Sequence, residues 1–355
     1  MTDSQTATSL ADSIRFAGDI QSTPLYLQDV AHFQQFSSAF RHSDLLVCDS
    51  LTPVLANAID EVVIRLRMPR KAVEAYIFES PNVQAHCLTG YSGACVIRFS
   101  SGLVTLLSPA EFKFVIGHEL GHFLLRHTTP SDETRESPER QIIRRAAEIS
   151  ADRIGLVACG DLEIAMRALM KSVSGLQDKY LRFDVASYVA QLGENEITSQ
   201  SSSLTHPSIP VRCRALLWFS LMPEAIQGQL KPAHREALDL RITRDLNKFI
   251  DAAANEQIRI AEKSLAMWLS IKSIVEDGRY SKSEQAWFIE RFGNEASSSV
   301  TNIFSAISHR DAIELADGRS EDALNELKSL APHTWGERLK IAQIMAASLP
   351  ASDRQ

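Results

Sequence analysis

The sequence contains few cysteines and no long apolar run. Its five cysteines are scattered along 355 residues without C-x-x-C spacing, a distribution typical of reduced thiols rather than of a disulfide framework. No stretch reaches the roughly 18 consecutive apolar residues that a transmembrane helix needs. The N-terminus, MTDSQTATSLADS, lacks the apolar segment of a signal peptide. We therefore expect a cytoplasmic protein with no integral membrane segment.

Basic residues are also fewer than acidic ones. The chain has 37 Lys and Arg against 44 Asp and Glu, a net charge of −7, so nothing indicates a nucleic-acid partner. Hydrophobic residues make up 45% and charged residues 23%, as in ordinary globular proteins. The length exceeds that of one average domain, which predicts two domains.

One helix has unusually complete start signals. Ser108 is a candidate N-cap, Pro109 occupies the first helical position, and Glu111 lies three residues after the serine, which together form a capping box. The residues that follow, FKFVIGHELGHFLLRH, are mostly apolar. The helix should therefore be largely buried.

This helix carries His118, Glu119 and His122 in an H-E-x-x-H pattern. Residues four apart share a helix face, so the two imidazoles can bind one zinc ion while Glu119 handles the proton of a water molecule. The pattern can also arise by chance, with the histidines simply packed. Burying two imidazoles and a carboxylate is costly unless they are paired or bound to metal, and this favours a metal site.

The third ligand can be sought in two places. The extended metzincin pattern requires a glycine and a histidine where this chain has Leu125 and Thr128, and His127 is one residue out of register and is predicted to cap the helix end. The next helix, PERQIIRRAAEISADRIGLVACG, instead carries Glu148 and Asp152 four residues apart among small residues. We expect Glu148 to be the third ligand and Asp152 to accept the second ring N–H of a ligand histidine.

Two further groups leave alternatives open. His206, in a His–Pro pair before a helix that carries Arg212, can form a cap and turn, or can stand with Arg212 opposite the zinc and stabilise an oxyanion. His86 and Cys87 lie between two strand-like runs. A structural position is favoured for this pair over a metal or catalytic role, and an edge strand beside a substrate cleft is the intermediate alternative.

Three motifs in order, GHELGHFLLRH, EISAD and THPSIPVRCRAL, resemble the zinc endopeptidases of the HtpX-like and CAAX prenyl protease family, over about residues 60–220. The resemblance implies a zincin-like gluzincin domain with one zinc per chain and Glu119 as general base and acid. It also implies that residues 83–88, VQAHCL, form the edge strand that pairs with substrate, although they lack the usual asparagine–alanine start. It further implies that the zinc ligands are His118, His122 and Glu148. Asp152 would be the partner of a ligand histidine, and His206 with Arg212 would give electrostatic support near the substrate.

The region from about residue 233 onward is helical in pattern and, through EDGRYSKSEQ, weakly resembles TerB-like domains. Asp–Gly–Arg turns are predicted at Asp277 and Asp317, without enough oxygen ligands for calcium. The predicted fold class is α+β, mostly α, with a small β-sheet and a C-terminal all-α bundle. The predicted organisation is a flexible tail over 1–20, a zinc metallopeptidase domain over 21–228 and a helical accessory domain over 233–355.

The predicted function is that of a zinc-dependent endopeptidase acting on a protein or peptide substrate, with a possible protein partner for the helical domain. The alternative is a narrow-specificity regulatory protease, or a metal-binding sensor, that acts on one partner through the C-terminal helical domain. A non-enzymatic scaffold is the third hypothesis.

Overall fold

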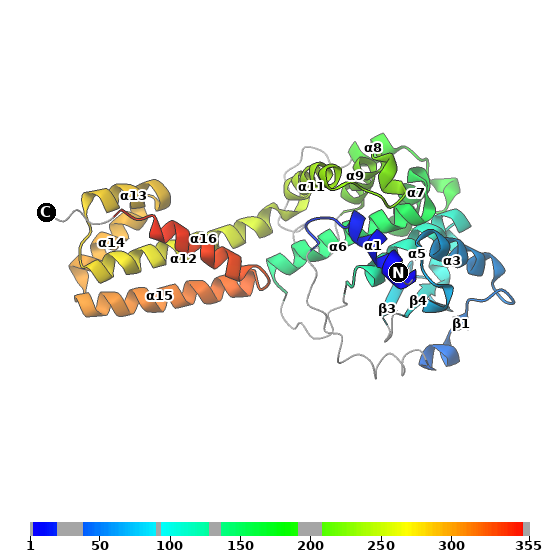
Figure 1. The fold of residues 1–355 in the computed structure, drawn as a ribbon, viewed down its shortest axis with the longest axis horizontal. Coiled ribbons are helices and arrows are strands. Elements are labelled where there is room, and N and C mark those ends of the chain that lie inside the picture. Colours follow the sequence, from blue (N-terminus) through cyan, green and yellow to red (C-terminus); the bar gives the residue numbers. More distant parts are fainter. Residues whose placement is uncertain (1–2, 20–37, 90–93, 128–135, 191–207, 351–355) are drawn as a thin grey trace. The chain divides into compact units, whose positions relative to one another are not determined.

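The computed structural model describes residues 3–19, 38–89, 94–127, 136–190 and 208–350. The chain divides into two compact units (Figure 1). The first comprises Met1–Glu133 and Ile143–Ile250, and the second comprises Thr134–Ile142 and Asp251–Gln355. Within the described residues, no helix combines the length and the apolar composition that a membrane crossing requires.

A four-stranded sheet in the order β1-β2-β4-β3 lies in the first unit. The central strands β2 and β4 are parallel, and β1 and β3 pair with them antiparallel at the two edges. The strands are β1 (Leu45–Leu46), β2 (Val73–Phe78), β3 (Ala85–Thr89) and β4 (Cys95–Ser100). The edge strand β3 therefore includes most of the segment that was expected to pair with substrate.

Helices make up most of the first unit, which confirms a mostly helical fold with a small sheet. They are α1 (Asp3–Ile14), α3 (Pro53–Arg65), α4 (Ser101–Leu106), α5 (Pro109–Leu124), α6 (Pro138–Cys159), α7 (Leu162–Ser174), α8 (Val185–Ala190), α9 (Ile209–Ser220), α10 (Pro223–Ile226) and α11 (Pro232–Leu246). Helix α5 contacts α3, α7 and β3, so it is packed on several sides.

The predicted start of α5 is confirmed. The Ser108 hydroxyl accepts a hydrogen bond from the Glu111 backbone N–H at 3.3 Å, and the Glu111 carboxylate accepts one from the Ser108 backbone N–H at 2.8 Å. Pro109 occupies the first turn, where its missing N–H has no cost. These contacts satisfy backbone donors that a buried helix end would otherwise leave unpaired.

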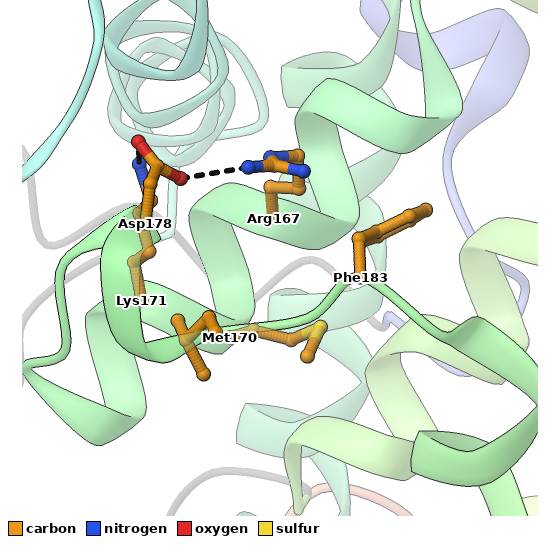
Figure 2. Close-up of a pocket in the computed structure, with 6 residues that line it drawn as sticks. Arg167, Met170, Lys171, Asp178 and Phe183 are labelled. Carbon is orange, nitrogen blue, oxygen red and sulfur yellow. Dashed lines mark hydrogen bonds and ion pairs between the residues drawn. The ribbon is translucent and has the colours of Figure 1, made fainter.

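The same Glu111 joins α5 to α7 through buried charge. The Lys171 ammonium lies 2.7 Å from the Glu111 carboxylate and 2.8 Å from Asp178, and Arg167 lies 2.7 Å from Asp178. Figure 2 shows Asp178 beside Arg167 and Lys171 around a small pocket that Met170 and Phe183 also line. Because Lys171 is only 1% exposed, its two carboxylate partners are what make its burial tolerable.

The expected flexible tail over residues 1–20 is wrong for its described part. Helix α1 packs into the core with Ala7, Leu10, Ala11 and Ile14, which are at most 4% exposed. These residues follow the i, i+3, i+4, i+7 spacing of an amphipathic helix. The segment therefore belongs to the folded first unit.

The boundary between the units lies at Ile250, later than the predicted one near residue 233. Arg153 of α6 explains the difference, since it is 1% exposed and donates hydrogen bonds to Asp239 of α11 at 2.6 Å and to the Ile14 carbonyl at 3.0 Å. Asp239 also accepts from the Ala17 backbone N–H at 3.0 Å. This buried pair holds α11 in the first unit together with α1 and α6.

The second unit contains only helices among its described residues. They are the first turn of α6, then α12 (Ala252–Asp277), α13 (Lys282–Phe292), α14 (Asn294–Ala306), α15 (His309–Leu330) and α16 (Trp335–Ala347). Helix α12 packs against α15 and α16. Gly278 ends α12 with φ of 74°, as a turn glycine should. The turn predicted at Asp317 is wrong, because this residue lies inside α15. The TerB-like resemblance stays a prediction.

Candidate metal centre

The first unit brings together the three predicted ligands. The Nε2 atoms of His118 and His122 on α5 lie 3.1 Å apart. The Glu148 carboxylate on α6 lies 3.6 Å from the His118 Nε2 and 3.5 Å from the His122 Nε2. Among the described residues, these three form the one group of His, Cys, Asp or Glu side chains close enough to hold a metal ion.

Close packing of α5 on α6 makes this convergence possible. A Cβ atom at Gly121 would lie 3.0 Å from the Ala151 Cα, and one at Gly117 would lie 2.3 Å from the Ala158 Cβ. The two glycines thus let the helix backbones approach more closely than larger residues would permit. Glu148, one turn before Ala151, is thereby brought up to the two histidines.

Asp152 fixes the orientation of His118. Its Oδ1 lies 3.0 Å from the His118 Nδ1, as predicted for a partner of a ligand histidine. Burial opposes ionisation of Asp152, but the charge and hydrogen bonds of Arg212 outweigh it and hold the Asp152 pKa below its ordinary value. An ionised carboxylate only accepts hydrogen bonds, so the His118 Nδ1 carries the proton and Nε2 is the atom left for a metal.

The charge balance of the site suits a cation. Burial lowers the pKa of His122 well below its ordinary value. Burial also acts to lower the pKa of His118, but its hydrogen bond to Asp152 and the charge of Glu148 raise it overall. One proton can therefore be shared between the two Nε2 atoms, and metal binding displaces such protons. Two nitrogens bound to one tetrahedral zinc are about 3.3 Å apart, close to the separation found here, so the residues fit zinc.

Glu119 lies beside the ligands and next to β3. Burial raises its pKa to about 7; the charge of His118 acts in the opposite direction, and the negative charge of Glu148 adds to the rise. A hydrogen bond from the Cys87 backbone joins Glu119 to β3. A carboxyl group whose pKa is near neutrality can both take up and release a proton.

Arg212 on α9 contacts two carboxylates of the site. Its Nε donates to the Asp152 Oδ2 at 2.7 Å, and its Nη1 lies 3.4 Å from the Glu148 carboxylate. The guanidinium therefore pairs with carboxylates of α6, which makes it a support of the ligand set. Its predicted partner His206 lies outside the described residues.

His86 and Cys87 both lie in β3, and the strand prediction for them is confirmed. The His86 ring stacks on Phe78, with ring centroids 6.3 Å apart. Neither residue joins the ligand group formed by the described residues. The favoured structural interpretation therefore agrees with the geometry.

Two residues of the site were missed by sequence reasoning. The His127 backbone N–H bonds to the His122 carbonyl at the end of α5, which agrees with the predicted helix-end cap, and its ring in addition contacts the His122 ring, with 2.8 Å between the two Nδ1 atoms. Its other nitrogen, Nε2, lies 2.9 Å from the Asp19 carboxylate. The histidine five residues after His122 was a usable signal. Nothing in the sequence pointed to Asp19, which is far away along the chain.

Two histidines and a glutamate around one point, with a second glutamate beside them, form a candidate metal site whose donor set suits zinc. Comparison with protein families agrees: residues 50–136 match the model of Peptidase family M48. This range contains the H-E-x-x-H motif and ends before Glu148, so the third ligand rests on the geometry. The match supports a Peptidase family M48 domain in this part of the chain.

A relative with an established name is similar to a larger part of the chain. The plastoglobule-localized metallopeptidase 48, chloroplastic, of Arabidopsis thaliana is 26% identical over 197 residues, which cover 47% of this chain. The chain spans 57% of the length of that relative. The comparison with solved structures found no match. The narrower HtpX-like or CAAX-type resemblance stays a prediction.

Proposed function

We propose that the chain is a zinc-dependent endopeptidase that hydrolyses peptide bonds in a protein or peptide substrate. The convergence of His118, His122 and Glu148 beside Glu119 is the observation that carries the proposal. The similarity to Peptidase family M48 over the motif supports it independently. The cytoplasmic location and the partner of the helical unit stay predictions.

Each side chain around the site has a distinct role in this proposed reaction. Zinc in this site would act as a Lewis acid toward the scissile carbonyl and would acidify the attacking water. Glu119 takes the proton from that water and later returns it to the leaving amine, which its raised pKa allows. Asp152 holds the His118 ring in place, and Arg212 holds Asp152 and balances the charge of Glu148.

Strand β3 offers a place for the substrate backbone. It pairs with β4 on one side, and among the described residues no strand pairs with its other side. An extended peptide can add to such an edge through main-chain hydrogen bonds. Because the Cys87 backbone contacts Glu119, a peptide bound along β3 would pass beside the general base.

The Glu119→Gln variant tests the proposal. Unchanged protein should cleave members of a peptide library and lose this activity in a zinc chelator, whereas Glu119→Gln should bind one zinc and cleave nothing. Glu295→Gln, a matched change at an exposed position of α14, should behave as the unchanged protein. Equal cleavage by the Glu119→Gln variant would show that the assignment is wrong. Cleavage confined to a single protein would instead favour the narrow-specificity alternative.

A further inference from the structure

The Nδ1 atoms of the two proposed ligand histidines, His118 and His122, contact different buried side chains. The His118 Nδ1 contacts Asp152 directly. The His122 Nδ1 lies 2.8 Å from the His127 Nδ1, and the His127 Nε2 lies 2.9 Å from the Asp19 Oδ2. The Asp19 side chain is 1% exposed and that of His127 is 11% exposed, so both groups are largely removed from water.

The direction of the hydrogen bonds in this chain follows from the donors available. A carboxylate only accepts hydrogen bonds, so the His127 Nε2, 2.9 Å from Asp19, is placed to donate its N–H. With its hydrogen on Nε2, the His127 ring presents a lone pair at Nδ1, which accepts the N–H of the His122 Nδ1. The His122 Nε2 is thereby left without a hydrogen on the side that faces His118 and Glu148. The chain of contacts selects the tautomer that can bind metal.

The backbone at the end of α5 is folded to make this contact. The His127 N–H donates to the His122 carbonyl at 2.8 Å, the six-to-one hydrogen bond of a Schellman motif. This motif places Arg126 in the left-handed region, with φ of 60°. That conformation is unfavourable for a residue with a Cβ atom, and such departures concentrate at functional positions. The turn directs the chain so that the His127 ring reaches the His122 ring.

Asp19 is held in position from two directions. Its backbone N–H donates to the Phe16 carbonyl at 3.0 Å, in a turn directly after α1. The Phe16 N–H in turn donates to the Ser150 Oγ of α6 at 3.1 Å, between the positions of Glu148 and Asp152. The Arg15 guanidinium also lies 3.8 Å from the Asp19 carboxylate and attracts it electrostatically.

We propose that His127 and Asp19 are positioning residues of the metal centre, which orient His122 and fix its tautomer for zinc binding. The N-terminal segment thus contributes Asp19 to the surroundings of the proposed zinc ligands. The inference rests on the proposed zinc function, but its prediction concerns metal affinity and needs no substrate. Partners of ligand histidines typically change metal affinity by about 10-fold to 100-fold when they are removed.

The test measures zinc affinity of the full chain by competition with a chromophoric chelator. His127→Ala and Asp19→Ala should each bind zinc about 10-fold to 100-fold more weakly than the unchanged protein. Asp19 acts through His127, so the double variant should bind no more weakly than His127→Ala. His127→Gln should recover part of the loss, because its amide can accept from His122 and donate to Asp19. His234→Ala, at a half-exposed histidine paired with Glu224, should have no effect.

Thermal unfolding of the zinc-free proteins separates positioning from general stability. A purely structural role would lower the unfolding temperature and leave zinc affinity unchanged, and that result would overturn the inference. If the double variant lost as much zinc affinity as the two single variants together, Asp19 would not act through His127, and that part of the inference would be overturned. If alanine prevents folding, Asp19→Asn and His127→Phe, which keeps a ring but has no nitrogen to accept from His122, carry the same test. Failure of the unchanged protein to bind zinc would overturn the proposed function along with this inference.

Discussion

Gly117 of α5 lies so close to Ala158 of α6 that a Cβ atom at Gly117 would come within 2.3 Å of the Ala158 Cβ. Real Cβ atoms do not approach this closely, so any side chain here would push the helices apart. Two of the proposed metal ligands lie on α5 and the third lies on α6. The separation of the two helices therefore sets the geometry of the metal centre.

Replacing this glycine should damage both the fold and the site. We expect Gly117→Ala to lower the free energy of unfolding by about 2 kcal/mol, the usual cost of overpacking a core. We also expect weaker zinc binding, because Glu148 would move away from the two histidines. Urea unfolding and chelator competition measure the two effects. Normal stability and affinity would mean that the α5–α6 contact is looser than the structure shows.

A second glycine gives the opposite prediction. Gly318 lies inside α15 with no atom within 4 Å of a Cβ placed there. Because alanine is the better helix former, Gly318→Ala should raise the free energy of unfolding by about 0.5–1 kcal/mol. The measurement is thermal unfolding followed by circular dichroism, and zinc affinity should stay the same. Destabilisation would instead favour the turn that the sequence predicted at Asp317.

Removing the third ligand should separate metal loss from misfolding. Glu148→Gln keeps the shape of the side chain but loses the charge that zinc prefers in a ligand. We expect zinc content by elemental analysis to fall well below one per chain, while the far-ultraviolet circular dichroism stays that of the unchanged protein. A full complement of zinc in this variant would exclude Glu148 as a ligand.

The grouping of His118, His122 and Glu148 could be predicted from the sequence because the evidence for it is local. The capping box at Ser108 and the four-residue spacings on two helices depend only on helix geometry. Asp19 could not be placed in this way, since its contact with His127 depends on how α1 packs, and that is determined by tertiary structure. The boundary after α11 was missed for a similar reason, because Asp239 reads as an ordinary surface charge until Arg153 is placed beside it.

The buried cluster at the start of α5 should contribute substantially to stability. In Lys171→Met the Glu111 carboxylate, 3% exposed, would lose its ammonium partner in the protein interior. Removing one partner of a buried ion pair typically lowers the free energy of unfolding by about 3–5 kcal/mol. We expect a loss of about 3 kcal/mol by urea unfolding, since Arg167 still lies 3.5 Å from Glu111.

The matched control for this cluster is Arg167→Met. Its side chain is 29% exposed and its nearer partner Asp178 is 56% exposed, so solvent screens that pair. The variant also removes the longer 3.5 Å contact with the buried Glu111, which keeps the Lys171 ammonium at 2.7 Å. Exposed pairs contribute about 1 kcal/mol or less, and Arg167→Met should therefore cost far less than Lys171→Met. Similar losses in both variants would show that burial does not set the strength of these ion pairs. A small loss in Lys171→Met alone would mean that Glu111 finds water when the ammonium is removed.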